Sequence, residues 1–210
     1  MEKVNYDKKM MEIINSFGGQ RPTLLLHTCC APCSTAVIER LSEYFDITVF
    51  YYNPNIEPYE EYLKRKEEQK RLLREYKSII PIKFLDCDYE NEEFSKFACD
   101  LAESHEGGKR CMLCFHLRLA KTAMTAKKKH FDYFGTSLTV SPYKSAYHVN
   151  SVGLALEKKQ GVKYLVSDFK KHDGYKRSII LAKEYHLYRQ DYCGCKYSKQ
   201  EREEYKKSKI

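Results

Sequence analysis

The sequence predicts an α/β fold with a mostly parallel sheet flanked by helices. Short apolar or β-branched runs alternate with helical segments along most of the chain, and no internal repeat or Pro/Gly/Ser-rich linker interrupts them. Such alternation is typical of right-handed β–α–β units, in which the strands run parallel. We therefore expect one α/β domain over residues 1–197, followed by a basic C-terminal helix or tail over residues 198–210.

Local patterns predict each element in chain order. Residues 7–17 carry apolar side chains at helical spacing, and Gly18-Gly19 ends this helix. The apolar run 23–27 predicts a strand buried on both faces, and Ser34 is placed to cap the helix that follows. The remaining elements are expected as strand 47–52, helix 59–76, strand 81–85, helices near 92–104 and 112–129, strand 131–134, helix near 145–158, strand 163–166, helix 175–187 and a basic terminal helix.

The predicted topology also places a site. In parallel sheets, ligands bind outside the carboxyl ends of the strands. The loops that follow the first, second and fourth predicted strands are therefore expected to meet at one rim: residues 28–34, 53–58 and 135–143.

Composition restricts the class of protein. The chain has 210 residues, and its 37 Lys and Arg against 29 Asp and Glu give a net charge of +8. No stretch approaches the ~18 apolar residues that a membrane span needs. The first residues show no apolar core or cleavage site of a secretory signal. We expect a cytoplasmic protein with no membrane partner, and the basic balance favours an anionic partner, with nucleic acid as the first candidate.

Nine cysteines in such a chain indicate metal or redox chemistry, because cytosolic thiols stay reduced. Cys29 and Cys30 come directly after a predicted strand and just before a helix N-terminus, whose dipole favours thiolates. Their sulfurs can converge only if the chain has already turned. Cys33 follows closely, and Cys87 and Cys99, which lack nearby partners, are expected to be structural.

Two further cysteine pairs leave the type of site open. Cys111 and Cys114 share one helix face and can reach one metal centre, although CxxC also suits zinc or a redox dithiol. Cys193 and Cys195 can ligate a metal or close a small disulfide ring around Gly194. Structural zinc and iron–sulfur clusters both take four cysteines, so the spacing alone does not decide between them.

Five segments taken together resemble the QueH family of epoxyqueuosine reductases, in order over about residues 20–197. The combination of CC, CxxC and YRQDYCGC is more specific than any one piece. The segments are LLLHTCCAPCS (24–34), YYNPNI (51–56), RCMLCFHLRL (110–119), FGTSLTVSPYK (134–144) and GYKRSIILAKEYHLYRQDYCGC (174–195).

The resemblance implies a nucleotide α-hydrolase-like (Rossmann-like) catalytic domain with a metal site at the carboxyl ends of the strands. It implies an iron–sulfur oxidoreductase that reduces epoxyqueuosine to queuosine at the wobble position of tRNA with a GUN anticodon. This two-electron deoxygenation, which releases water, is the final step of queuosine biosynthesis. An electron donor of unknown identity is also implied.

The resemblance also implies residue roles. Cys29, Cys30, Cys111 and Cys114 would hold a [4Fe–4S] cluster. Cys193 and Cys195 would form a redox-active pair or would bind an additional iron ion. Cys33 is not expected to be a ligand. The residues expected to bind the modified base are Tyr52, Asn53, Asn55, Ser141, Tyr143 and Lys144.

The proton donor and two competing functions stay open. The candidate donors are Tyr192, Tyr175, Lys171 and His27, of which His27 is better suited to a supporting hydrogen bond. A zinc-stapled RNA-binding module shares the cysteines and the charge. A tRNA sulfur-transferase on the same fold would need ATP, yet HTCCAPCS stands where ATP-using relatives carry a phosphate loop.

Overall fold

Five parallel strands form the centre of the molecule, as predicted. The computed structural model describes residues 4–209, so residues 1–3 and 210, the outer ends of the two predicted regions, lie outside the described residues. The strand order is β3-β2-β1-β4-β5. The strands are β1 (Thr23–His27), β2 (Asp46–Phe50), β3 (Lys83–Leu85), β4 (Tyr133–Thr136) and β5 (Lys163–Tyr164).

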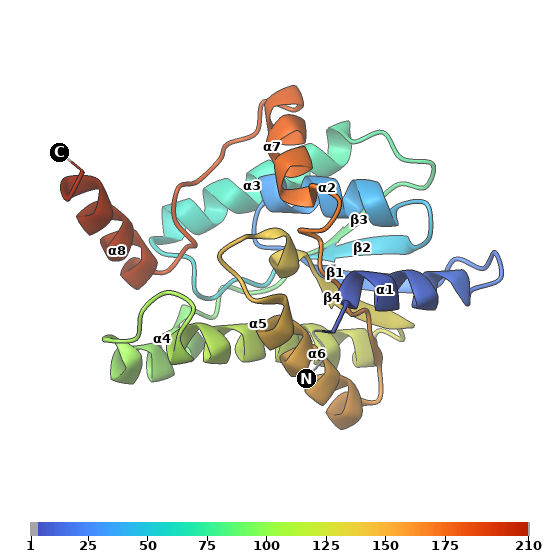
Figure 1. The fold of residues 1–210 in the computed structure, drawn as a ribbon, viewed down its shortest axis with the longest axis horizontal. Coiled ribbons are helices and arrows are strands. Elements are labelled where there is room, and N and C mark those ends of the chain that lie inside the picture. The colour runs from blue at the N-terminus through green and yellow to red at the C-terminus, as the bar shows by residue number, and fades with distance from the viewer. Residues whose placement is uncertain (1–3, 210) are drawn as a thin grey trace.

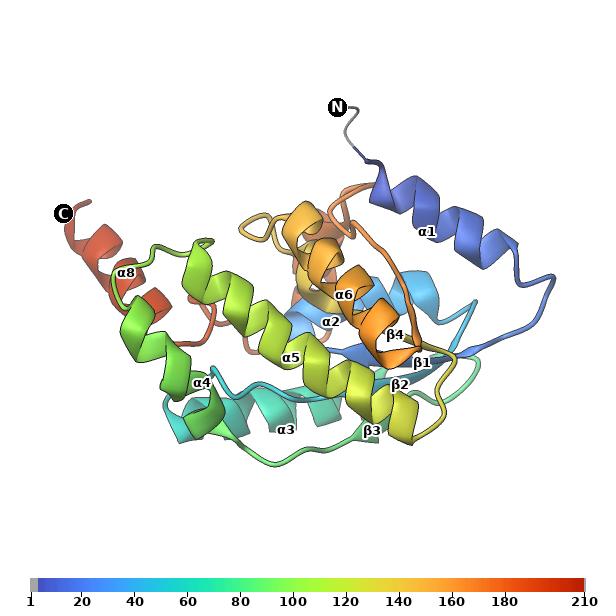
Figure 2. The same cartoon turned by 90° about the horizontal axis from the view of Figure 1, so that it is seen from below.

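Helices cover both faces of this sheet. In Figures 1 and 2, α2, α3 and α7 lie on one side of the strands, and α5 and α6 lie on the other. The helices are α1 (Tyr6–Asn15), α2 (Ala31–Leu41), α3 (Tyr59–Glu75), α4 (Asn91–Ala98), α5 (Lys109–Lys128), α6 (Ala146–Gln160), α7 (Gly174–Glu184) and α8 (Lys196–Lys207).

Strand β1 occupies the position that matters for function. The chain proceeds from β1 to β2 and β3 on one side, then crosses to β4 and β5 on the other. The side on which the chain adds its next strand therefore changes at β1, although all strands stay parallel. Open α/β sheets bind ligands at such a switch point. The loop that leaves β1 is the one that carries Cys29 and Cys30.

Alternation along β1 explains the two apolar layers. Leu24 and Leu26 pack with Val37 and Ile38 of α2, whereas Leu25 packs with Leu119 of α5 on the opposite face. Successive side chains of a strand point to opposite faces, so a fully apolar strand must be covered on both. The sequence-based prediction for 23–27 is confirmed.

The predicted cap of α2 is wrong. The helix begins at Ala31 with Cys30 as its N-cap residue, and Ser34 lies inside the helix. Pro32 stands in the first turn, where its fixed φ suits a helix start and its missing N–H costs nothing. The single hydrogen of the Ser34 hydroxyl is instead shared between the Ala31 carbonyl at 2.9 Å and Gln69 Oε1 at 3.0 Å.

Three strands end at other residues than predicted. β5, expected over residues 163–166, ends at Tyr164. β2 ends at Phe50 rather than Tyr52, and β4 ends at Thr136 rather than Phe134. The backbone of β2 finds its last partner at Leu85 of the short strand β3, so the chain beyond is free to turn. The helix predicted over 92–104 also stops early, because α4 ends at Ala98 and a 3₁₀ turn follows.

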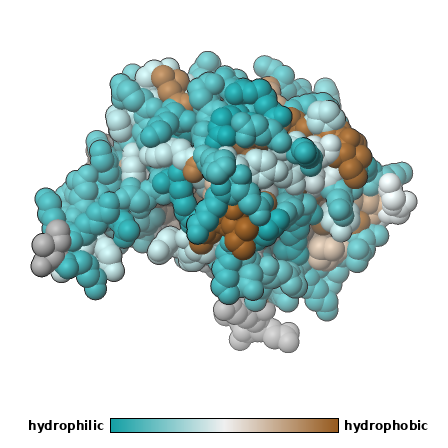
Figure 3. Space-filling view, turned by 90° about the horizontal axis from the view of Figure 1, so that it is seen from above, coloured by the Kyte–Doolittle hydropathy of each residue, from teal (hydrophilic) through white to brown (hydrophobic). Residues whose placement is uncertain are grey.

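The surface reflects the charged composition. On the face shown in Figure 3, hydrophilic residues dominate and hydrophobic residues form small separate groups. Among residues 4–209, the structure contains no helix with the length and apolar character needed to cross a bilayer.

Candidate metal and redox site

Three cysteines converge where β1 passes into α2. The Sγ atoms of Cys29 and Cys30 are 3.8 Å apart, and those of Cys29, Cys30 and Cys33 all lie within 4.8 Å of one another. Cys30 has an extended backbone as the N-cap of α2, so the chain has turned between the strand and the helix, as the sequence required. Three thiols at these separations can hold a metal ion.

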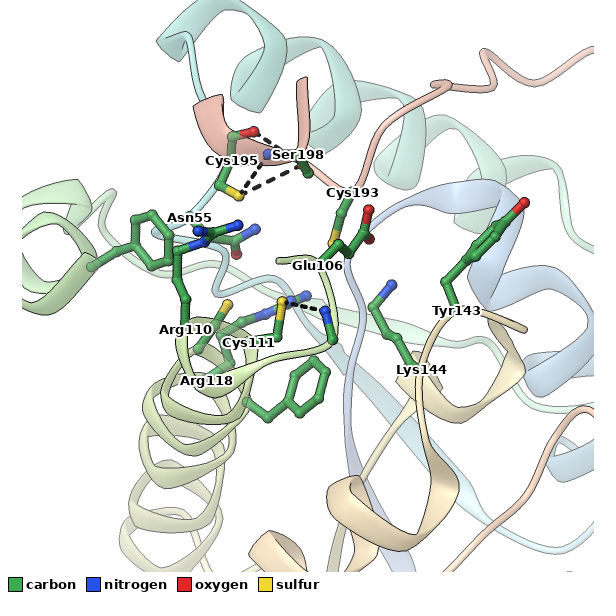
Figure 4. Close-up of a pocket in the computed structure, with 14 residues that line it drawn as sticks. Asn55, Glu106, Arg110, Cys111, Arg118, Tyr143, Lys144, Cys193, Cys195 and Ser198 are labelled. Atoms are coloured by element: carbon green, nitrogen blue, oxygen red, sulfur yellow. Dashed lines mark hydrogen bonds between the residues drawn. The ribbon is translucent and has the colours of Figure 1, made fainter. Parts of the chain in front are cut away.

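Four more cysteines line a narrow neighbouring cavity of about 20 Å³. Cys111 and Cys114 reach it from the first turns of α5, and Cys193 and Cys195 reach it from the segment before α8 (Figure 4). Burial raises the pKa of the Cys111 thiol to about 11 and that of Cys114 to about 12. A bound cation is therefore needed to keep these two sulfurs as thiolates at neutral pH.

The glycine between Cys193 and Cys195 is required by the backbone. Gly194 has φ +148, and a Cβ there would lie 3.0 Å from Ile56 and 3.1 Å from the Asn55 amide. The Gly194 carbonyl accepts a hydrogen bond from the Glu57 amide at 2.9 Å. This close approach sets the two sulfurs against the loop that follows β2.

A buried arginine connects the two cysteine groups. Arg118 is only 1% exposed, and its guanidinium donates to Asn53 Oδ1 at 2.7 Å and to His27 Nε2 at 3.2 Å. Burial by itself lowers the Arg118 pKa, but the sulfurs of Cys114 and Cys29, when ionised, raise it overall. Within residues 4–209, no carboxylate forms an ion pair with this side chain.

The buried charge of Arg118 indicates whether an anionic metal centre would be stable at this site. A buried guanidinium needs a negative partner, because an isolated buried charge is costly. A [4Fe–4S]²⁺ core bound by four thiolates is net 2−, so such a centre would supply that partner. The donor set and the buried cation both fit an iron–sulfur centre.

Lys144 adds a second cation at the cavity. Burial lowers its pKa, but the thiolates of Cys193, Cys29 and Cys33 raise it overall, so the side chain is an ammonium. In Figure 4, Lys144 points toward the cavity beside Glu106 and Cys193. The turn after β4 positions it, because the Lys144 amide donates to the Ser141 carbonyl at 3.2 Å.

Comparison with known proteins agrees with this geometry. The family model described as epoxyqueuosine reductase QueH matches residues 24–201. The chain belongs to the QueH family.

Curated QueH relatives cover most of the chain. Proteins named epoxyqueuosine reductase QueH are 44% identical in Staphylococcus epidermidis, over 92% of this chain and 84% of that protein, and 43% identical in Streptococcus pyogenes serotype M1, over 94% and 79%. The protein of that name in Thermotoga maritima is 36% identical over 87% of this chain and 93% of its own. The resemblance found in the sequence is confirmed.

The structure brings only some of the predicted substrate residues of this QueH chain to the cysteine cavity. Asn55, Tyr143 and Lys144 line it. Asn53 lies buried, donating to the Thr28 carbonyl at 2.8 Å. The Ser141 hydroxyl accepts from the Tyr143 amide at 3.3 Å and so stabilises the turn.

Tyr52 lies elsewhere. Its hydroxyl donates to Glu90 at 2.8 Å, and its ring lines a separate groove with Lys121. The structure therefore does not bring Tyr52 to the cysteine cavity.

The four candidate proton donors also lie outside the residues that line this QueH cavity. The Tyr192 hydroxyl donates to the Glu57 carbonyl at 2.8 Å, and the Tyr175 hydroxyl accepts from Arg189 at 3.0 Å. Burial, assisted by Arg118, lowers the His27 pKa to about 3, so this imidazole is neutral and serves as a hydrogen-bonding support.

Sequence reasoning missed Arg118 and Glu106. Arg118 stands four residues after Cys114, and i,i+4 residues share a helix face, so a signal was present in RCMLCFHLRL. Glu106 lies in the loop before α5 and reaches the cavity only because that loop folds over it. Nothing in its local sequence marks it.

Proposed function

We propose that this protein reduces epoxyqueuosine to queuosine at the wobble position of tRNA with a GUN anticodon. The observation that carries the proposal is the convergence of seven cysteines from three distant segments at the switch point of the sheet, together with Lys144. Curated relatives over most of the chain carry the name of this activity. The enzyme is an oxidoreductase of tRNA modification.

Four of these cysteines, Cys29, Cys30, Cys111 and Cys114, are proposed to hold a [4Fe–4S] cluster. When bound, the cluster supplies electrons one at a time. The two cysteine groups adjoin at Arg118, whose guanidinium lies close to both Cys29 and Cys114. Cys33, which was not expected to be a ligand, lies within 4.8 Å of the first pair, so we propose that it is available to bind the additional iron ion that the sequence had assigned to Cys193 and Cys195.

The reaction needs two electrons and two protons, because the epoxide oxygen leaves as water and an alkene remains. In our proposal, Cys193 and Cys195 supply the two electrons and the two protons when their thiols become a disulfide. One of these protons reaches the oxygen through Glu106, which gives its own proton to the oxygen and is reprotonated by a thiol. A reductant then restores the thiols. Both cysteines are free thiols in this structure, and Gly194 gives the chain the turn that joins their sulfurs at one cavity.

Lys144 and Glu106 are proposed to stabilise and protonate the departing oxygen. The Lys144 ammonium is proposed to donate a hydrogen bond to the epoxide oxygen and to stabilise its developing negative charge. Partial desolvation raises the pKa of the Glu106 carboxyl, so this group holds a proton more readily than an ordinary glutamate. Glu106 is therefore proposed to protonate that oxygen.

The flipped base is proposed to enter past Tyr143 and to meet Asn55. Tyr143 is 76% exposed at the cavity and offers a ring for stacking. Asn55 Oδ1 is buried at the cavity and has no hydrogen-bond partner within the described residues. A buried unpaired acceptor of this kind is suited to a donor group of the substrate.

Replacing Glu106 with glutamine is expected to lower the turnover number about 100-fold, because the amide cannot release a proton. The Glu106 pKa is raised, so wild-type turnover should fall as pH rises through that pKa, and this pH limb should disappear in Glu106→Gln. The measurement is turnover against pH. Glu103→Gln, an exposed glutamate in the same region, is the matched control. A wild-type pH profile in Glu106→Gln would contradict the assignment.

The decisive test uses epoxyqueuosine-containing tRNA. Protein purified without air is incubated with this tRNA and dithionite, and the digested nucleosides are analysed by mass spectrometry. Loss of one oxygen from the modified nucleoside is the expected result. Unchanged substrate with a fully iron-loaded protein would reject the proposal, as would a colourless zinc protein. Dependence on ATP would favour a sulfur-transferase instead.

A further inference from the structure

A buried arginine of α3 holds the segment that carries Cys193 and Cys195. Arg65 is 1% exposed, and its Nη1 donates to the Cys193 carbonyl at 2.9 Å. Its Nε donates to Glu61 at 2.7 Å, and the guanidinium lies 5.0 Å from the centre of the Tyr192 ring. One side chain thus fixes the chain where it enters this turn.

The remaining nitrogen of Arg65 is unused. Nη2 is buried and has no hydrogen-bond partner within residues 4–209. A buried N–H left without a partner costs about 1–3 kcal/mol, so a native site normally supplies an acceptor. Glu61 does not supply this acceptor, because its carboxylate already accepts hydrogen bonds from Arg65 Nε and from the Tyr188 hydroxyl at 3.1 Å.

The acidic groups that influence this guanidinium are the Glu61 carboxylate and two sulfurs. Burial lowers the Arg65 pKa, whereas the thiolates of Cys30 and Cys29 and the Glu61 carboxylate raise it overall. The same segment contacts Cys30 directly, because Gln190 Nε2 lies 2.9 Å from the Cys30 sulfur. Arg65 therefore binds, at Cys193, the same segment that contacts the CC pair through Gln190.

We propose that Arg65 is a positioning residue that fixes the Cys193 turn above the CC pair and places a positive charge and a spare N–H donor beside the sulfurs of the metal site. The inference rests on the proposed function. Positive charge and N–H···S hydrogen bonds stabilise the more negative, reduced form of a thiolate-bound centre, so they make it easier to reduce.

Three variants separate the two contributions of Arg65. Arg65→Met removes the charge and the hydrogen bonds but keeps an unbranched chain of similar length. Arg65→Lys keeps the charge and loses the fork that binds Glu61 and the Cys193 carbonyl together. Arg71→Met is the matched control, because Arg71 also lies on α3 and donates to the Tyr185 and His186 carbonyls, but no cysteine lies among the groups that affect its pKa.

The experiment titrates the iron-loaded variants with dithionite without air and follows the visible absorbance. We expect Arg65→Met to have a more negative midpoint potential than wild type. Arg65→Lys, which keeps the charge but loses the guanidinium donors, should shift in the same direction by less, whereas Arg71→Met keeps the wild-type value. With tRNA substrate, turnover should fall about tenfold in Arg65→Met, the lower end of the loss typical for groups that support metal ligands, and also fall in Arg65→Lys, with KM nearly unchanged.

An unchanged potential in Arg65→Met would overturn the proposal, and so would an equal shift in Arg71→Met. If Arg65→Met does not fold, wild-type turnover in Arg65→Lys would overturn the positioning role. The titration contains no tRNA. A failure of the reductase assay in wild type would therefore reject the proposed function without affecting the result for Arg65.

Discussion

Replacing Cys114 with alanine is expected to remove the visible colour of the protein and most of its bound iron and sulfide. Cys114 is buried at the cavity, one helical turn from Cys111, and is one of four proposed cluster ligands. Losing one thiolate leaves an iron without its ligand and leaves the Arg118 charge without a partner. Cys29→Ala should behave in the same way. The measurement is iron and sulfide content with the absorption spectrum after anaerobic purification.

Cys99→Ala is the matched control for this loss. Cys99 is an exposed thiol whose hydrogen-bond acceptors, the Lys96 carbonyl and the Asp100 carboxylate, lie in its own helical turn. It should keep full iron content. Full iron content in Cys114→Ala as well would show that the proposed ligand set is wrong.

Replacing Cys193 with alanine is expected to leave most of the colour but to abolish turnover. In our proposal this thiol stores reducing equivalents and does not bind the cluster, so its loss removes the dithiol and spares the iron. The measurements are the visible spectrum of the purified variant and the conversion of epoxyqueuosine-containing tRNA.

Cys87→Ala, which changes a half-buried thiol that does not line the cysteine cavity, should keep both properties. A colourless Cys193→Ala would have a clear structural meaning. Cys193 and Cys195 face the same cavity as Cys111 and Cys114, so these four sulfurs would then be the cluster ligands.

Most of the fold could be predicted from local sequence patterns. A run such as residues 23–27 has no polar face, so it must be covered on both sides, and this requirement dictates a central strand with helices on either face. The end of β2 could not be predicted from the sequence, because Tyr51 and Tyr52 suit a strand equally well. Their exclusion depends on the shortness of β3, which is a property of another part of the chain.

The cysteines of the site were predictable, but the cations around them were not. Close pairs such as Cys29 and Cys30 are visible in the sequence as an excess over packing needs. Arg65 lies on a helix rich in Lys and Arg, and only tertiary packing distinguishes it from its solvent-exposed neighbours. Tyr52 shows the same limit, since the direction of a side chain after a strand depends on where the strand ends.

The position of Cys193 and Cys195 along the chain has a consequence for biogenesis. Translation delivers β1, α5 and all the other cysteines before residues 193–195 leave the ribosome. Arg65 and Arg118 are also made long before the last two thiols arrive. If the earlier sulfurs hold the iron as proposed, a nascent chain has these ligands in place early, but the cavity gains its last two cysteines only after nearly all of these 210 residues have been synthesised.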